Sequence, residues 1–261
     1  MLNIKEIYAI LDEHFPFSEA EPWDNAGLLV EGKSEINKVL VSLDATKDVI
    51  LEAKEKGCDL IICHHPVIFD PLKSLLDEIP AVLALKNGIS IISAHTNYDV
   101  SSFGADEHFS NALFKKCGFK SEGYLEITQN FPAPHGFGKV GTLDRAYSEE
   151  EFAQILKEIF GCENIRAVKC GNKIQKIAFC CGGGSDYIAL ANKLGCDAYI
   201  TSDVKHSGFI FAKNNSLSLF APTHYQMEKA AMQNLYSLIK DKADKIEVIL
   251  SQCESEPSCI L

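Results

Sequence analysis

Short apolar runs alternate with amphipathic segments along the first half of the chain. The runs Lys38–Leu43, Leu60–Cys63 and Ile89–Ser93 are short and rich in Val, Ile or Leu, so they predict buried strands. Lys47–Lys56 carries its apolar residues at helical spacing, and Met1–Phe17 predicts an amphipathic helix. Strands that alternate with helices are typical of an α/β fold whose strands are largely parallel.

The second half of the chain repeats this pattern. The segment KVLVSLDATKDVILEAKEKGCDLIICHH from Lys38 aligns without a gap to KIAFCCGGGSDYIALANKLGCDAYITSD from Lys176. A further strand follows in each half, in ISIISAHTNYD from Ile89 and in LSLFAPTHYQME from Leu217. We therefore predict two similar three-layer α/β domains that arose by internal duplication, with the strand ends brought together between them.

Composition narrows the class of protein. The chain of 261 residues is 46% hydrophobic, and its formal net charge of -11 argues against general nucleic-acid binding, which needs a cationic surface. The N-terminus lacks a signal-peptide pattern, and no apolar run is long enough to cross a bilayer. There are ten cysteines and no CxxC pair. We interpret those in or beside apolar runs as reduced core residues of a cytoplasmic protein: Cys58, Cys63, Cys180, Cys181 and Cys196.

Histidines and carboxylates gather just beyond the predicted strands, where α/β proteins place their ligands. Imidazole mixed with carboxylate suits zinc, manganese, iron, cobalt or nickel better than calcium or magnesium. We interpret these residues as the candidate site: His64, His65, His95, Asp99, Asp203, His224 and Glu228.

Two pairs within this set differ in how specifically they indicate a metal site. His64 and His65 directly follow the apolar run Leu60–Cys63, where consecutive imidazoles suit neither a core nor an ordinary surface. His224 and Glu228 are four residues apart, so a helix would place them on one face, but an exposed pair would have the same spacing. His14, His108 and His135 are interpreted as ordinary surface or hydrogen-bonded histidines.

A glycine-rich turn follows the predicted strand Ile177–Cys181. Its residues Gly182–Gly184 offer backbone amides that can hold a phosphate. A tight turn with Ser185 as the N-cap of the next helix explains the same residues, and we favour it slightly.

Five segments together resemble a known family: EPWDNAGLLV from Glu21, LIICHHPVIF from Leu60, SAHTNYD from Ser93, GCDAYITSDVKH from Gly195 and APTHYQMEKAA from Ala221. They are similar to the GTP cyclohydrolase 1 type 2 homologues, or NGG-interacting factor three-like proteins, over nearly the whole chain. The resemblance implies two α/β domains with a cleft for two divalent metal ions per subunit, and a homohexamer.

The resemblance also implies roles for single residues. The metal ligands fall on His64, His65, Asp99, His224 and Glu228, with Glu228 as the bridge. His95 lines the site as a proton carrier, and Asp44, Asp203 and His206 lie nearby. The expected domains are 1–123 for the first half, 124–220 for the second, and 221–261 for a segment that returns to the first half and completes the metal site. The part 124–171 is either a strand-turn-helix insertion or part of the second domain, with a helix that starts at Ser148.

Two functions remain open from the sequence. The first is a metal-dependent hydrolase in which two ions activate water, acting on a small molecule such as the nucleotide GTP. The second is a non-enzymatic regulatory or metal-handling protein that acts through protein partners, with ions retained for assembly. Five protein ligands shared by two ions leave open positions, which favours catalysis.

Overall fold

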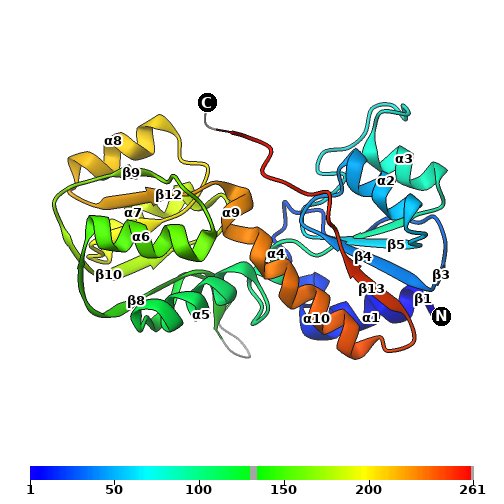
Figure 1. The fold of residues 1–261 in the computed structure, drawn as a ribbon, viewed down its shortest axis with the longest axis horizontal. Coiled ribbons are helices and arrows are strands. Elements are labelled where there is room, and N and C mark those ends of the chain that lie inside the picture. The colour runs from blue at the N-terminus through cyan, green and yellow to red at the C-terminus, as the bar shows by residue number, and fades with distance from the viewer. Residues whose placement is uncertain (130–133, 260–261) are drawn as a thin grey trace. The chain divides into compact units, whose positions relative to one another are not determined.

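The computed structural model describes residues 1–129 and 134–259 and divides into two compact units (Figure 1). The first unit consists of Met1–Phe103 together with Ala231–Leu261, and the second is Gly104–Ala230. The division falls at Phe103, whereas the sequence placed it at residue 123, because the helix that follows Phe103 packs against the second sheet and the next strand belongs to that sheet. The chain returns to the first unit at Ala231.

The first unit contains a five-stranded sheet in the order β13-β4-β5-β6-β2. Four of its strands are parallel and the edge strand β2 is antiparallel. The strands are β2 (Gly27–Val30), β4 (Lys38–Ser42), β5 (Leu60–Cys63), β6 (Ser90–Ser93) and β13 (Glu247–Leu250), with a separate pair of β1 (Leu2–Asn3) and β3 (Glu35–Ile36).

Helices cover both faces of this sheet. The apolar side chains of α2 and α3 pack with those of β4, β5 and β6 in one cluster, while α10 packs against β4 and β13. Asn3 and Glu6 form a capping box at the start of α1, and Thr46 caps α2. The helices are α1 (Ile4–His14), α2 (Lys47–Glu55), α3 (Pro80–Lys86), α4 (Thr96–Asp99) and α10 (Met232–Lys242).

The second unit contains a six-stranded sheet in the order β7-β8-β10-β11-β12-β9. Its central strands β10, β11 and β12 are parallel, and the flanking strands are antiparallel to their neighbours. The strands are β7 (Lys120–Gln129), β8 (His135–Ser148), β9 (Arg166–Val168), β10 (Lys173–Phe179), β11 (Ala198–Ile200) and β12 (Ser218–Ala221).

Five α-helices belong to this unit among the described residues, and α6 begins where the sequence predicted. Ser148 accepts from the Glu151 backbone N–H, and the Glu151 carboxylate accepts from the Ser148 N–H, so the capping box is complete. The helices are α5 (Ala105–Cys117), α6 (Glu149–Phe160), α7 (Ile188–Lys193), α8 (His206–Asn214) and α9 (His224–Glu228).

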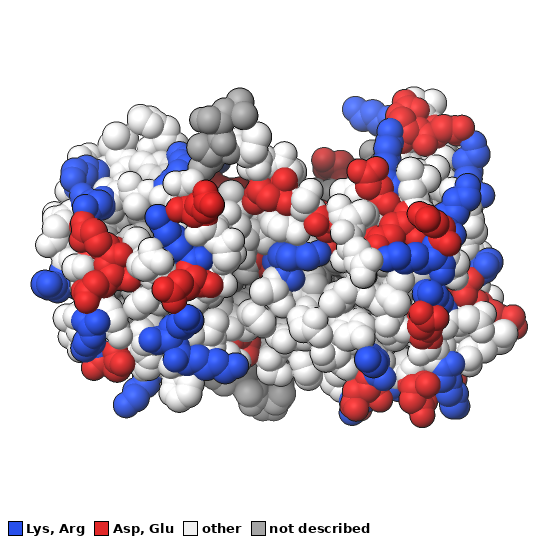
Figure 2. Space-filling view, viewed as in Figure 1, with Lys and Arg blue, Asp and Glu red and all other residues white. Residues whose placement is uncertain are grey.

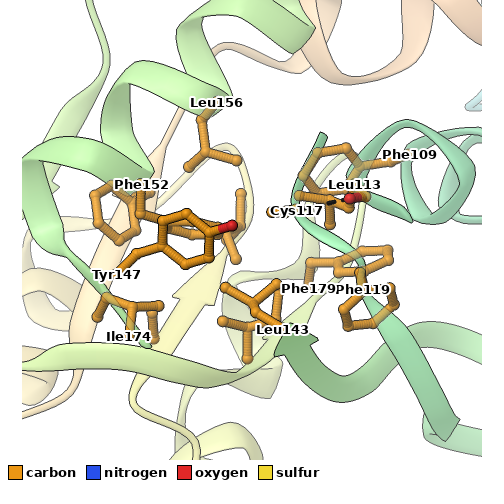
Figure 3. Close-up of a cluster of buried hydrophobic side chains, with 14 of the residues drawn as sticks. Phe109, Leu113, Cys117, Phe119, Leu143, Tyr147, Phe152, Leu156, Ile174 and Phe179 are labelled. Atoms are coloured by element: carbon orange, nitrogen blue, oxygen red, sulfur yellow. Dashed lines mark hydrogen bonds between the residues drawn. The ribbon is translucent and has the colours of Figure 1, made fainter. Parts of the chain in front are cut away.

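Side chains of the second sheet alternate between two apolar layers. Ile177 and Phe179 of β10 pack with helices α5 and α6, in the cluster shown in Figure 3, whereas Ala178 packs with α7 and α8 on the other face. Edge-to-face rings of Phe109 and Phe179, with centroids 4.7 Å apart, join α5 to the sheet. Two α/β domains, the second with helix, sheet and helix layers, confirm the predicted fold class.

The duplication is visible in single hydrogen bonds. Asp59 follows the Gly-Cys break of the first unit, and its Oδ2 accepts from the Asn37 N–H at 3.0 Å. Asp197 holds the equivalent place in the second unit and accepts from the Gln175 N–H, also at 3.0 Å. Each aspartate therefore hydrogen-bonds to the backbone at the first strand of its own repeat. The register between the first and second strands is the same in both copies, since Val39 pairs with Leu60 and Ile177 with Ala198.

The predicted burial of cysteines is confirmed for Cys58, Cys63, Cys180 and Cys196, whereas Cys181 is half-buried. No described helix has the length and apolar character that a membrane span requires. On the face in Figure 2, Lys and Arg side chains are interspersed with Asp and Glu.

The C-terminal segment is fastened to α2 of the first unit by Glu52. The Glu52 carboxylate accepts from the Lys56 ammonium at 2.6 Å, the Ser251 hydroxyl at 2.7 Å and the Gln252 N–H at 3.0 Å. Burial raises the pKa of Glu52, but these hydrogen bonds outweigh burial and bring the pKa from 4.5 to about 2.

We predict that Glu52→Gln lowers the free energy of unfolding at neutral pH by about 1–3 kcal/mol, because charge-assisted hydrogen bonds are lost. The lowered pKa means that the carboxylate contributes its stability above pH 4.5 and loses it as the pH falls toward 2. Urea unfolding of both proteins across this range measures the difference. A gap that stays constant down to pH 2 would contradict the assignment.

Candidate metal centre

Three histidines of the first unit lie together at the carboxyl ends of adjacent parallel strands. His64 and His65 follow β5, and His95 follows β6 by two residues. Cys63 and Ser93, the last residues of these strands, are paired in register, so the chain leaves both strands at one edge of the sheet. Each of the three side chains offers a ring nitrogen within 4.8 Å of the other two.

The Nδ1 atoms of the vicinal pair are both held by oxygen acceptors. His64 is fully buried, and its Nδ1 donates to the Ala94 carbonyl at 2.8 Å. His65 Nδ1 lies 2.9 Å from Oδ1 of Asp44. Since a carbonyl or carboxylate oxygen accepts, the proton of each neutral ring resides on Nδ1. Each Nε2 then carries the lone pair that a metal ion requires.

His95 is held in the same way by Asp24. Its Nδ1 lies 2.8 Å from Oδ1 of Asp24, whose other oxygen accepts from the backbone and hydroxyl of Thr96. Burial of the Asp24 side chain raises its pKa, but the hydrogen bonds from His95 and Thr96 prevail and lower the pKa from 3.8 to about 2. Asp24 therefore remains a carboxylate at neutral pH.

Sequence reasoning missed Asp24 as a member of this site. The residue lies within the segment EPWDNAGLLV, which carried part of the family resemblance, but nothing in the spacing connects it to His95. Only the tertiary structure brings the two side chains together, because the loop before β2 packs beside the end of β6.

Asp99 joins the histidines from the short helix α4. Its Oδ1 lies 3.5 Å from Nε2 of His64, and its side chain is 18% exposed. Ligand atoms that share an ion at ordinary metal–ligand distances lie about 3–3.5 Å apart, so this pair fits a common ion. The structure therefore brings His64, His65, His95 and Asp99 into one group.

A second group of candidate ligands lies in the second unit, at the start of α9. A capping box between Thr223 and Gln226 starts this helix. As the helical spacing predicted, His224 and Glu228 lie on one face, with Nε2 and Oε2 2.9 Å apart. His224 Nδ1 lies 2.6 Å from Oδ2 of Asp203. A neutral imidazole has one proton for these two carboxylates, so a cation beside Nε2 fits this arrangement.

Asp203 adopts the left-handed region, with φ 52°, just after β11. Few residues except glycine and asparagine or aspartate adopt it readily, and such conformations cluster at functional sites. In the internal repeat Asp203 is equivalent to His65, so each copy places a polar ligand-type side chain at the end of its second strand.

Gly182 lies against the carboxylate of this group. Its φ is +68°, and a Cβ at this position would lie 2.2 Å from Oε1 of Glu228 and 3.3 Å from Nε2 of His224. In the repeat Gly182 is equivalent to Asp44. The second copy thus has no counterpart of the Asp44 side chain, which is hydrogen-bonded to His65 in the first copy. The Glu228 carboxylate lies in the corresponding space.

The prediction that Ser185 caps a helix was wrong. Ser185 lies inside the 3-10 helix Gly184–Tyr187, whose N-cap is Gly183 without a side-chain hydrogen bond. The Gly182 carbonyl instead accepts from the Gly184 N–H at 3.0 Å, within the turn, and from the Ser202 N–H at 3.1 Å, which joins the turn to the segment after β11. The close approach of Glu228 explains why position 182 is a glycine. Neither the phosphate-binding interpretation nor the helix-cap interpretation of the sequence included this contact.

A family model described as Duf34/NIF3 (NGG1p interacting factor 3) matches residues 2–257. The chain belongs to the Duf34/NIF3 family. The family resemblance drawn from the sequence motifs is thereby confirmed.

Relatives of this Duf34/NIF3 chain match along most of its length. It is 34% identical over 238 residues to "GTP cyclohydrolase 1 type 2" of Helicobacter pylori, with 88% of each chain covered. A "GTP cyclohydrolase 1 type 2 homolog" of Clostridium perfringens is 29% identical and covers 98% of both. The crystal structure of Staphylococcus aureus hypothetical protein SA1388 superposes with a TM-score of 0.88 at 28% identity, covering 100% of this chain and 99% of that one.

Two further histidines of the Duf34/NIF3 chain lie apart from these contacts. His206 is exposed at the start of α8, and its side chain makes no hydrogen bond or ion pair within the described residues. His14 donates from Nδ1 to the Ile10 carbonyl at 2.9 Å, the structural role expected of it.

We predict that Gly182→Ala disrupts the His224–Glu228 group, because its Cβ requires Glu228 to move. Gly195→Ala is the matched control, since Gly195 has φ +69° and nothing within 4 Å of its Cβ position. In both variants the alanine adopts a positive φ, which costs a similar backbone strain of about 1 kcal/mol. Elemental analysis should show metal lost from Gly182→Ala and retained by Gly195→Ala. Equal metal content in the two variants would refute the role of this close approach.

Proposed function

We propose that this Duf34/NIF3 protein is a metal-dependent hydrolase that holds two divalent ions per chain. The observation that carries the proposal is the common arrangement of four imidazoles, each fixed at Nδ1 by an oxygen acceptor. This contact orients Nε2 as a metal ligand in three of them and, in His95, as a proton acceptor. The ligands we propose are His64, His65, Asp99, His224 and Glu228.

The donor set supports a transition metal or zinc. Three imidazoles and two carboxylates suit zinc, manganese, iron, cobalt or nickel. The outer contacts from the Ala94 carbonyl, Asp44 and Asp203 are of the kind that orients metal-bound histidines and raises their basicity. Five protein ligands for two ions leave coordination positions for water and substrate, as catalytic sites require.

When bound, two such ions supply Lewis acidity and lower the pKa of a coordinated water toward neutrality. The protein would contribute proton transfer at His95. Asp24 stays ionised and holds Nδ1–H, so Nε2 of His95 can accept a proton and the resulting imidazolium is stabilised by the carboxylate. The same pair returns that proton to the leaving group.

The reaction class we propose is hydrolysis of a small molecule, with a nucleotide such as GTP as the first candidate. The name of the Helicobacter pylori relative, GTP cyclohydrolase 1 type 2, supports this choice. We further propose that the protein is cytoplasmic and forms a homohexamer. Light scattering on the purified protein tests the number of subunits. If metal binds but no substrate is turned over, the non-enzymatic alternative of a regulatory or metal-handling protein takes its place.

We predict that His64→Ala combined with His65→Ala removes most bound metal and leaves the fold intact. The reason is that two ligands of the first unit are lost together. Elemental analysis and circular dichroism measure the two effects. His14→Ala serves as the control, because His14 hydrogen-bonds to the Ile10 carbonyl and belongs to neither group of candidate ligands, so the variant should keep full metal content. Full occupancy in a folded double variant would overturn the ligand assignment.

For the reaction, we predict that His95→Gln retains metal and lowers kcat by about 10²- to 10⁴-fold, the usual contribution of a general acid or base. Metal-replete protein is incubated with GTP, other nucleotides and phosphoesters, with Glu228→Ala as the background. Loss of metal from His95→Gln would make His95 a ligand instead. If no compound reacts faster with the unaltered chain than with Glu228→Ala, the hydrolase proposal fails.

A further inference from the structure

Two large aromatic side chains of the first unit are exposed beside His95. Trp23 is 60% exposed and Phe69 is 52% exposed. Their ring centroids lie 6.2 Å and 6.4 Å from the His95 ring, and 6.1 Å from each other. Trp is ordinarily well buried, so a neighbouring pair of exposed rings at a candidate site requires an explanation.

Both rings are attached to anchored backbone. The side chain of Asp24, next to Trp23, is buried and hydrogen-bonded to His95 and Thr96. Asn25 donates from Nδ2 to the carbonyl of Ile68, the neighbour of Phe69, at 2.6 Å. These bonds connect the two loops to each other and to the end of β6. The aromatic pair is therefore positioned before any ligand arrives, which lowers the entropy cost of binding.

The geometry limits how a ligand can use these rings. The planes of Trp23 and Phe69 are inclined by 47°, and a centroid spacing of 6.1 Å is too small for a third ring between them. A ligand ring needs about 3.5 Å on each side. A ligand ring therefore does not fit between the two side chains, and we expect it to stack on Trp23 with Phe69 beside it.

We propose that Trp23 and Phe69 form the binding surface for a planar heteroaromatic ring of the substrate. The inference deepens the proposed hydrolase function and rests on it. A ring placed there lies next to His95, whose own ring is 5.1 Å from that of His64 and 5.7 Å from that of His65. Bases stack on aromatic side chains whatever their hydrogen-bonding pattern, so the surface selects a ring system rather than one particular base.

Trp23 provides its own probe, because it is the only tryptophan in the sequence. Metal-replete protein is titrated with guanosine 5′-monophosphate, and tryptophan fluorescence is excited where the nucleotide absorbs little. We expect saturable quenching. Ribose 5-phosphate, which has the same sugar and phosphate without the ring, is the matched control and should leave the signal unchanged. Equal responses to both compounds, or none to either, would overturn the proposal.

Substitution at Trp23 separates stacking from general apolar contact. By calorimetry, Trp23→Leu should weaken nucleotide binding about 10- to 100-fold, and Trp23→Phe should restore part of it. Elemental analysis should find full metal content in both variants. Unchanged affinity in Trp23→Leu, or loss of its metal, would contradict the assignment. If the nucleotide binds through Trp23 but is not hydrolysed, the binding surface stands and only the proposed reaction fails.

Discussion

The hydrogen bond from a histidine Nδ1 to an oxygen acceptor is the interaction on which both groups of candidate ligands depend. In the first unit the acceptors are the Ala94 carbonyl, Asp44 and Asp24, and in the second the acceptor is Asp203. Each bond fixes both the tautomer and the ring orientation. Without it an imidazole can turn either nitrogen outward, and ligand positions would not be defined before a metal binds.

The internal duplication explains how one scaffold supplies two different groups of candidate ligands. Both copies end their strands at equivalent places, and both keep the aspartate that fixes the strand register, Asp59 and Asp197. The copies then diverge at the strand ends. The first retains Asp44 as the acceptor for His65, whereas the second has Gly182, where the absent side chain leaves space for Glu228.

Much of this was predictable because its signals are local. Buried strands, the α6 capping box and the His224–Glu228 helical pair all follow from spacing over a few residues. Three features depend instead on loop conformation and long-range packing, which periodicity does not encode. These are the contact of Asp24 with His95, the place of Ser185 inside a 3-10 helix, and the approach of Glu228 to Gly182. The family resemblance contributed the proposed ligand set, which spacing alone left open.

The most direct test of the account is anomalous X-ray diffraction from crystals of the protein grown with zinc or manganese. The account predicts two anomalous peaks per chain, with the histidines His64, His65 and His224 bonded through Nε2 while Nδ1 keeps its oxygen acceptor. Coordination through Nδ1, or crystals without metal at these residues, would contradict it.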